Sequence, residues 1–419
     1  YIEKTNQLIK ILNNISLGTS VILIDGFAET ILCETKGPET RSIEEPTNEI
    51  SIRGPRDGFV ENIYTNISLL RKRIRTPHLW LENFKIGDLT KTEIAIAYIK
   101  GLASEELIEE VRSRLQKIDI ESVLESGYLQ EFLKDEPYTL FPLIERTERP
   151  DKVISCLTEG RVAILTNNTP FVLVVPTKYN MLLQTPDDYY EDFHIGSLIR
   201  ILRHLAFIIS ILLPGSYVAI VNFHPELLPV GLLLRIASSR EGVPFPVIVE
   251  SLLMESIFEI LREAGIRLPQ AIGPAISIVG ALVLGEAAIN AGLVSPPMVI
   301  IVALTAIASF TTPDYTLANT ARILRYIFIL LGGTLGLFGI QYGFLLTAIH
   351  ICSLRSFGQP YFSPFAPLIW QDLKDSIIRL FLWQHTTRPK LVGGKEPEKQ
   401  DNNQKPKNPG EKEESEGKK

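Results

Sequence analysis

The residues of this chain whose types and spacing could do chemistry are carboxylates set among apolar side chains. Residues 244–266 read VPFPVIVESLLMESIFEILREAG, and three of their four glutamates recur every fourth residue, on one face of a helix. Two uses are open: a helix at a membrane interface with its acids in water, or carboxylate rings that concentrate cations at a pore mouth in a symmetric assembly. The second use predicts an acidic vestibule formed by Glu255, Glu259, Glu263 and Glu286. Arg262 and Arg267 could neutralise these acids, and such a ring would then carry little net charge.

A hydroxyl-bearing edge follows in residues 295–312, SPPMVIIVALTAIASFTT. Pro297 suits the first turn of a helix, because its missing N–H would be unpaired there anyway. One edge of this helix then carries Met298, Val302, Thr305, Ser309 and Thr312. We predict that this edge lines a narrow pore whose apolar ring gates by dewetting. Small polar residues also let membrane helices pack closely, so ordinary helix packing is the alternative.

Arginines in two loop motifs form a weaker pattern. RGPRDGF (residues 53–59) could hold a phosphate or a partner's carboxylate, and ERTERPDK (residues 145–152) could form an inter-subunit contact or a salt-bridged surface turn. From them we predict inter-subunit or partner contacts at Arg53, Arg56, Arg146 and Arg149. Arg322 and Arg325 are expected in a cytoplasmic loop between two membrane spans.

Enzyme chemistry and bound cofactors are not indicated. The sequence has no P-loop, HExxH, nucleophile elbow or GxGxxG motif after a strand. Its three cysteines lie far apart and show no metal-ligand spacing. The net charge of −6, without a long basic stripe, gives no reason to expect nucleic acid as a partner. We therefore predict no enzyme activity, no cofactor and no metal.

Two halves of different composition must position these residues. Of the 419 residues, 45% are hydrophobic and 21% are charged, which is an apolar balance for a soluble protein. The first half reads as a cytoplasmic α+β region, with a hairpin turn at Asp25-Gly26, a helix N-cap at Ser104, and strands RVAILT and FVLVVP. We divide it into two small subdomains, residues 1–88 and 89–192. Tyr1 is not a natural start, so the first subdomain is expected to lack an N-terminal piece.

Residues 193–385 are expected to form a polytopic bundle of four to six membrane helices. LAFIISILLPGSYVAIVNF (residues 205–223) has close to the roughly 20 apolar residues that span a bilayer. Arg200 and Arg203 before it favour a cytoplasmic N-terminal side. Other apolar segments occupy residues 268–294, 298–312 and 326–352, and LGGTLGLFG could break the last one in two. We expect an interfacial helix over residues 362–383 and a disordered cytoplasmic tail over residues 386–419.

Several long motifs resemble one protein family. RGPRDGFVENIYTNISLLRKRI, LESGYLQEF, ERTERPDKV, LREAGIRLP and SIVGALVLGEAAI, with AGLVSPPMVIIVALTAIASF, are similar to the A subunit of the nutrient germinant receptors of spore-forming bacteria. The resemblance implies a multi-pass protein of the spore inner membrane with a cytoplasmic N-terminal domain in two parts. It also implies two partners: a transporter-like B subunit that senses the nutrient, and a lipoprotein C subunit.

The motifs and the resemblance together predict a spore germination receptor subunit that forms an ion channel. Identical copies would form a ring, with five the favoured number, that conducts monovalent cations once the nutrient-sensing partner signals. The alternative is a non-conducting scaffold or signal-transducing subunit, and a related group of the family acts in spores without sensing nutrients. A solute carrier is disfavoured, because the spans show no repeated pair of broken helices. Membrane lipid is the remaining expected partner.

Overall fold

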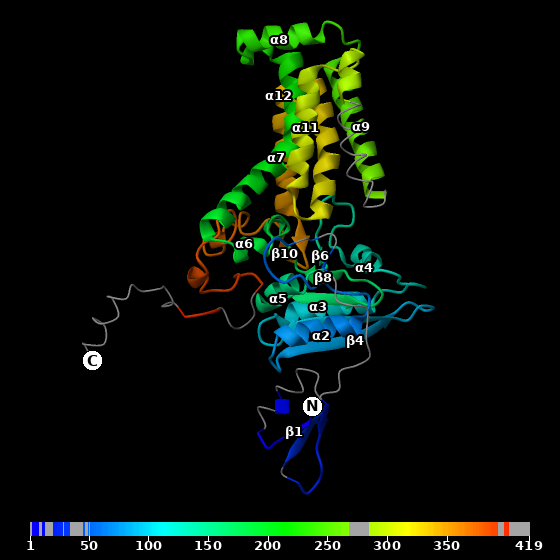
Figure 1. The fold of residues 1–419 in the computed structure, drawn as a ribbon, viewed down its shortest axis with the longest axis vertical. Coiled ribbons are helices and arrows are strands. Elements are labelled where there is room, and N and C mark those ends of the chain that lie inside the picture. Colours follow the sequence, from blue (N-terminus) through cyan, green and yellow to red (C-terminus); the bar gives the residue numbers. More distant parts are fainter. Residues whose placement is uncertain are drawn as a thin grey trace, which may run out of the picture. The chain divides into compact units, whose positions relative to one another are not determined.

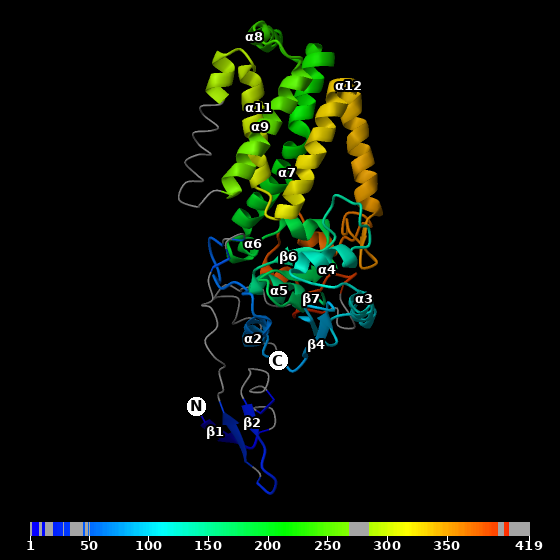
Figure 2. The same ribbon diagram turned by 90° about the vertical axis from the view of Figure 1, so that its right-hand side faces the viewer.

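The chain folds into two units, one of strands and helices and one of helices (Figures 1 and 2). In this computed structural model, the first unit comprises Tyr1–Thr139, Leu143–Leu198 and Leu354–Lys419, and the second comprises Leu140–Pro142 and Ile199–Ser353. The structure describes residues 2–7, 11–12, 20–27, 29–33, 45–46, 49, 51–267, 285–392 and 398–401.

Three short antiparallel strands near the N-terminus form a small sheet in the order β1-β3-β2. They are β1 (Ile2–Thr5), β2 (Ser20–Ile22) and β3 (Thr30–Cys33). The predicted hairpin is confirmed, because β2 and β3 pair on either side of Asp25-Gly26. Gly26 has φ +84°, a conformation that glycine adopts without steric cost. Ile22 pairs with Ile31, so the connection is longer than a two-residue turn.

Five antiparallel strands form the central sheet of the first unit, in the order β4-β5-β7-β8-β6. They are β4 (Leu79–Ile86), β5 (Thr92–Ile99), β6 (Glu145–Thr147), β7 (Val162–Thr166) and β8 (Val172–Val175). β7 and β8 are buried on both faces, which explains why they read as continuous apolar runs. The predicted strands RVAILT and FVLVVP are confirmed as this pair.

Helices cover both faces of the central sheet, with α2 and α3 on opposite sides of it in Figure 2. The four helices are α2 (Ile63–Arg73), α3 (Glu105–Gln116), α4 (Ser126–Leu133) and α5 (Pro150–Thr158). α2 and α5 share a core with Ala95 and Ala97 of β5, whereas α3 and α4 share one with Ile94 and Ile96. The predicted N-cap is confirmed, since Ser104 Oγ accepts a hydrogen bond from Leu107 N at 3.2 Å.

The predicted division at residue 88 falls inside this sheet. β4 and β5 pair along their whole length, from Leu79 with Ile99 to Ile86 with Thr92, so residue 88 lies in a hairpin turn. Strands from both sides of it contribute to the same two cores. The structure therefore corrects the two-subdomain division: residues from about 51 to 198 form one three-layer domain, and the N-terminal strands form a sheet of their own. The polar residues around Gly87 are as typical of a turn between two strands as of a linker between domains, so their composition does not distinguish the two.

Residues 354–392 belong to the first unit, not to the helical one. They begin with the hairpin of β9 (Arg355–Ser356) and β10 (Gln359–Pro360), where Ser356 Oγ accepts from Thr177 N at 2.9 Å and donates to Leu143 O at 2.7 Å. The short 3-10 helices η3 (Asp372–Lys374) and η4 (Leu382–Gln384) follow. The expected interfacial helix over residues 362–383 is therefore wrong.

Buried polar contacts explain this docking. Arg379 is buried, and its Nη1 donates to the backbone oxygens of Asp188 and Glu191 at 2.7 Å each. Asp188 lies in the short helix α6 (Asp187–Tyr190), and Glu191 follows its last residue. Arg388 Nε donates to Thr158 O at 3.1 Å, which ties the start of the predicted tail to α5. Most of that tail lies outside the described residues.

The second unit is helical. Its helices include α7 (Phe193–Phe223), whose first residues belong to the first unit, η2 (Pro225–Leu227), α8 (Val230–Arg240), α9 (Val247–Arg267), α11 (Pro296–Phe310) and α12 (Tyr315–Ser353). Residues 285–290 are also helical. α7 and α12 are long and apolar enough to cross a membrane, and α11 is a shorter apolar helix. In Figure 1, α8 lies across one end of the bundle formed by the others. Residues 268–284 of the predicted span 268–294 lie outside the described residues.

α12 is a helical hairpin. Gly336 interrupts it with φ +64° and ψ −150°, a conformation that side-chain-bearing residues rarely adopt. A Cβ on Gly343 would lie 3.1 Å from Phe328 Cε1, although 15 residues of straight helix span roughly 22 Å. The two limbs therefore run antiparallel, as Figure 2 shows. The break lies in LGGTLGLFG, the segment in which the sequence allowed for a broken span.

Candidate functional site

A buried ion pair joins three helices of the second unit. Glu255 Oε2 of α9 lies 2.7 Å from Arg325 Nη1 of α12, and their side chains are 0% and 1% exposed. Arg325 Nε also donates to Ser210 O of α7 at 2.7 Å. A buried charge is tolerated only when it is paired and hydrogen-bonded, so α7, α9 and α12 are held together by one arginine.

A second buried carboxylate holds the start of α11. Glu250 Oε1 of α9 accepts hydrogen bonds from Ser295 N at 2.6 Å and from Ser295 Oγ at 2.5 Å. Ser295 is the N-cap of α11, where free backbone N–H groups and the helix dipole favour a negative charge. Arg240 of α8 is 3.7 Å from the other carboxylate oxygen. Glu250 thus connects α8, α9 and α11.

The predicted vestibule acids on α9 have cationic partners within the chain. Glu259 pairs with Arg262 at 2.8 Å and lies 3.8 Å from Arg322. The more exposed Glu263 pairs with Arg267 at 2.7 Å. Glu286 is exposed in the helical residues 285–290, which lie between α9 and α11 in the sequence. A ring of the α9 acids would carry little net charge in this arrangement, and the vestibule stays a prediction.

Sequence reasoning missed Arg325. It was expected with Arg322 in a cytoplasmic loop, and that expectation is wrong, because both lie inside α12. The available signal was an arginine next to a long apolar run, which needs an acid from another helix. Which acid it meets depends on helix packing.

The predicted pore-lining edge of α11 faces the interior of a single chain. Met298, Val302, Thr305, Ser309 and Thr312 are all buried. Met298 and Val302 pack in a cluster with Met254 of α9, Val218 of α7 and Ile329 of α12. The hydroxyls of Thr305 and Ser309 donate to backbone oxygens of their own helix, each at 2.7 Å. The opposite edge, with Ile300, Leu304 and Ile307, is 50–64% exposed. The pore-lining role stays a prediction.

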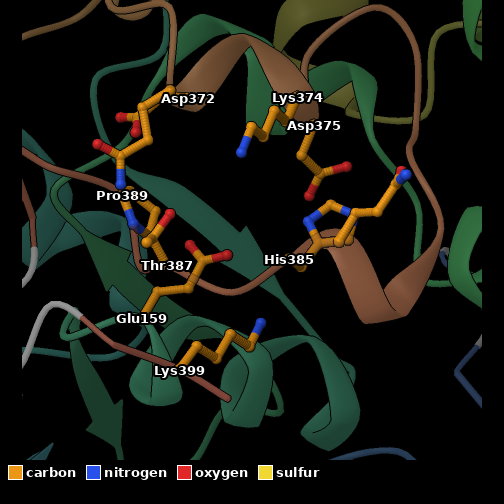
Figure 3. A pocket seen from close by; sticks show the side chains of 10 residues that line it. Glu159, Asp372, Lys374, Asp375, His385, Thr387, Pro389 and Lys399 are labelled. Atoms are coloured by element: carbon orange, nitrogen blue, oxygen red, sulfur yellow. The ribbon is translucent and has the colours of Figure 1, made fainter. Parts of the chain in front are cut away.

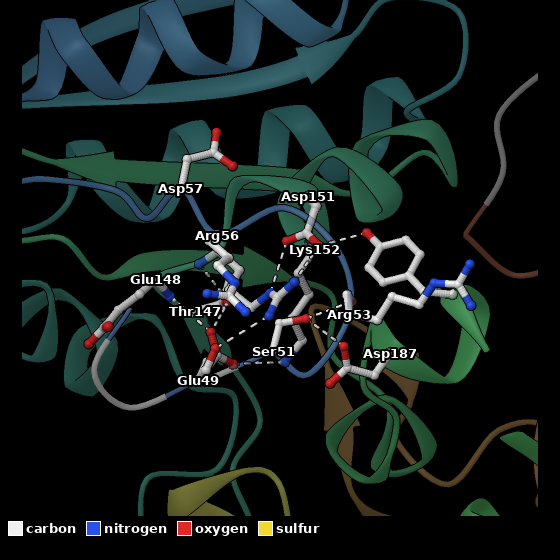
Figure 4. Close-up of polar contacts among 12 residues, drawn as sticks. Glu49, Ser51, Arg53, Arg56, Asp57, Thr147, Glu148, Asp151, Lys152 and Asp187 are labelled. Atoms are coloured by element: carbon white, nitrogen blue, oxygen red, sulfur yellow. Dashed lines mark hydrogen bonds and ion pairs between the residues drawn. The ribbon is translucent and has the colours of Figure 1, made fainter. Parts of the chain in front are cut away.

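A polar cluster in the first unit brings the two arginine motifs together (Figure 4). Arg149 is almost fully buried, and its guanidinium binds both carboxylate oxygens of Asp151, at 3.0 and 2.6 Å. Tyr190 Oη donates to Asp151 Oδ2 at 2.7 Å. Burial would raise the pKa of Asp151, but the hydrogen bonds from Arg149 and Tyr190 outweigh it and hold the pKa below its usual value. Arg149 Nη1 also reaches Glu49 O at 3.3 Å, beside the loop of the other motif.

The other arginines of these motifs differ from Arg149. Arg53 and Arg56 are exposed and make only long ion pairs, 3.9 Å to Glu191 and 3.8 Å to Glu45. The Arg146 guanidinium lies 5.5 Å from the centre of the Phe171 ring. Arg149 therefore has a structural position, whereas Arg53 and Arg56 remain available for a partner.

A small cavity of about 60 Å³ lies between α5 and the C-terminal segment of the first unit (Figure 3). Glu159, Asp372, Lys374, Asp375 and His385 line it, with other polar residues of the same segment. Asp372 is 3.8 Å from the buried Lys178. Burial and the nearby Arg161 lower the pKa of Lys178 to about 8. This volume holds a few water molecules, and the part of the chain described here contains no group of acids, histidines or cysteines arranged for a metal.

The fold and these sites define a class: an α+β domain joined to a set of apolar helices with paired charges inside, which suggests membrane association. The chain belongs to the Bacillus/Clostridium GerA spore germination protein family, whose sequence profile matches residues 1–391. The resemblance drawn from the motifs is thus confirmed.

Individual relatives are similar over most of the chain. Spore germination protein KA of Bacillus subtilis (strain 168) is 50% identical over 95% of this chain and 73% of its own length. The uncharacterized membrane protein YfkQ of the same organism is 47% identical, over 91% of this chain and 74% of that protein. One solved structure is similar to part of this chain: the crystal structure of the N-terminal domain of the A subunit of the Bacillus megaterium spore germinant receptor GerK3. The matched residues are 36% identical and cover 43% of this chain and 64% of that chain, with a TM-score of 0.32.

Proposed function

We propose that this chain is the A subunit of a germinant receptor in the spore inner membrane, with its α+β domain in the cytoplasm. We further propose that copies form a ring, five being the favoured number, that conducts monovalent cations when a nutrient-sensing B subunit signals, together with a lipoprotein C subunit. Membership of the GerA family supports the receptor role. Two helices of spanning length and the exposed aliphatic edge of α11 support a place in the membrane.

The observation that carries the channel proposal is the charge pairing among α7, α9, α11 and α12. Ionisable residues within membrane helices mark functional positions more often than structural ones. Here Arg325 lies in α12, which is long and apolar enough to cross a membrane, and Glu250 and Glu255 fasten α9 to α11 and α12. Because the hydroxyl edge of α11 packs against α9, a water path along that edge requires the two helices to separate. We propose that the described arrangement is the non-conducting one, and that Glu250 and Glu255 hold it closed.

Ion flux from liposomes tests the proposal. The purified oligomer should conduct monovalent cations, and Thr305→Val, which removes one hydroxyl from the edge, should change the flux severalfold. The matched control is Leu304→Met on the exposed edge, which should leave the flux unchanged. Equal effects of both substitutions on the flux would show that the hydroxyl edge does not line the ion path.

A non-conducting scaffold is the second candidate function. It is favoured by the burial of Met298, Val302 and Thr305 inside one chain, where helix packing alone accounts for their position. In that case no flux would be measured with any partner or nutrient present, while the complex would still assemble.

A further inference from the structure

α4 presents an apolar stripe on its outer face. Leu129 and Leu133 on its inner face are fully buried in the core of the first unit. Leu124, Tyr128 and Phe132 follow one another at intervals of four residues and are 58%, 43% and 53% exposed. That spacing places Tyr128 and Phe132 along one line of the helix, whereas Leu124 precedes the extended N-cap residue Glu125. Exposed aromatic residues in such a line are typical anchors of protein interfaces.

The segment that carries this stripe is acidic. Residues 104–136, which include α3 and α4, contain ten acidic and four basic residues, a net charge of −6. Two of the four basic residues, Arg112 and Arg114, are already bound to acids of the same unit. This layer therefore combines a net negative charge with an exposed apolar stripe. An anionic lipid surface would repel it.

The opposite layer of the same unit is basic. Residues 53–75, which include α2, contain six basic and two acidic residues, a net charge of +4. Lys72 and Arg75 at the C-terminal end of α2 are exposed, as are Arg53 and Arg56. Tyr64, Ser68 and Lys72 share the outer face of α2, and Tyr64 is 63% exposed. This layer thus offers exposed basic groups and an exposed tyrosine, whose hydroxyl donates to Glu93 Oε2 at 2.9 Å.

We propose that the α4 face of one copy docks on the α2 face of the next copy. The two faces are complementary in charge and lie on opposite sides of one sheet, so the contact is head-to-tail. A head-to-tail contact closes a ring when the rotation between successive copies divides a full turn, whereas two α4 faces or two α2 faces would repel each other. The inference rests on the ring assembly of the proposed function and assigns its contact surface in the α+β domain.

Two full-length variants test this contact, one on each face. Phe132→Arg places a positive charge on the α4 face, and the double variant Lys72→Glu with Arg75→Glu reverses the α2 face. All three positions are exposed, so folding is unaffected. Each variant in detergent should assemble at least about tenfold more weakly than the wild type, measured by light scattering after size exclusion. Phe27→Ser, at an equally apolar position that is 74% exposed in the β2–β3 connection, is the matched control and should assemble normally.

Mixing the two variants distinguishes a head-to-tail contact from any other. Each variant keeps one intact face, so the mixture should form two-chain species and nothing larger. Rings that persist unchanged in both variants would overturn the α4–α2 contact and leave the proposed function standing. If the α2 variant instead loses only its binding to vesicles containing phosphatidylglycerol, the basic face is a lipid contact and the inference also fails. A wild-type chain that remains monomeric would contradict the ring itself.

Discussion

At the scale of single residues, the most consequential contact is the pair of Glu255 and Arg325. Both side chains are removed from solvent, and each offsets the cost of burying the other. Glu263 and Arg267 form a pair of similar length on an exposed part of the same helix, where water screens it. The two pairs have similar distances, so it is their burial that indicates which one matters more for stability.

Removing one member of the buried pair should be far more damaging than removing both. Glu255→Leu or Arg325→Leu alone should lower the free energy of unfolding by about 3–5 kcal/mol, because an unpaired charge stays buried. The double variant should recover most of that loss. Thermal unfolding of the purified protein in detergent measures both, with Glu263→Gln as a control expected to cost at most about 1 kcal/mol. Additive losses in the double variant would contradict a direct coupling.

The buried Lys178 should make the stability of the first unit depend on pH. Its pKa is about 8 in the folded protein and 10.5 ordinarily, because burial and Arg161 disfavour the charged form while Asp372 and Glu159 favour it. Below pH 8 the lysine is protonated in both states. Between pH 8 and 10.5 only the unfolded state keeps the proton, so the free energy of unfolding should rise with pH, by up to about 3 kcal/mol. Denaturant unfolding of wild type and Lys178→Met at pH 7.5 and pH 10 isolates this term; a difference that does not change with pH would refute it.

At the scale of elements, glycines set how closely the helices of the second unit approach. Gly215 of α7 and Gly332 of α12 bring two backbones into contact, and Gly336 lets α12 reverse direction. Small residues at such contacts are how apolar helices associate when hydrophobic burial gives little net gain. The sequence LGGTLGLFG thus serves both the contact and the turn.

A methyl group at Gly332 should separate these helices. It would overlap Gly215 O and lie 3.1 Å from Ile340 Cδ1. Gly332→Ala should therefore destabilise the protein by about 1–3 kcal/mol. Gly231→Ala in α8 is the matched control, since nothing lies within 4 Å of the new methyl. It should be neutral or stabilising by about 0.5–1 kcal/mol. Melting temperatures of the two variants in detergent decide between these outcomes.

At the scale of the whole molecule, the chain combines a three-layer α+β domain with a helical unit that suggests membrane association. Belonging to the GerA family places it in spore germination. If the helical unit spans the membrane as proposed, the α12 hairpin puts both its ends on one side and Gly336 on the other.

Cysteine labelling checks this topology. Cys352 is exposed near the end of α12, whereas Cys156 is buried, and burial raises the pKa of its thiol so that little thiolate forms. In a background without Cys33 and Cys156, a membrane-impermeant maleimide should label Cys352 and a Tyr315→Cys variant from the same side. Leu335→Cys should be labelled from the opposite side. Labelling of all three from one side would show that α12 does not form a membrane-spanning hairpin.

The local features of this chain were readable from its sequence. Helix caps, turns and strands depend on neighbouring residues, so Ser104, the Asp25-Gly26 hairpin and the strands β7 and β8 follow from local patterns. The edge of α11 that carries Met298 and Thr305 was also identifiable, though not what covers it. The family was recognisable because its long motifs are contiguous in sequence.

Only the tertiary structure decided which distant residues meet. Glu255 and Arg325 are 70 positions apart, and their pairing depends on how α9 and α12 pack. The same holds for residues 354–392, whose apolar composition suits a membrane interface but whose Arg379 finds its partners beside α6. The spacing of residues in the sequence predicts which side chains share one face of a helix or strand. It does not predict which other element packs against that face, because that depends on the arrangement of all elements in the fold.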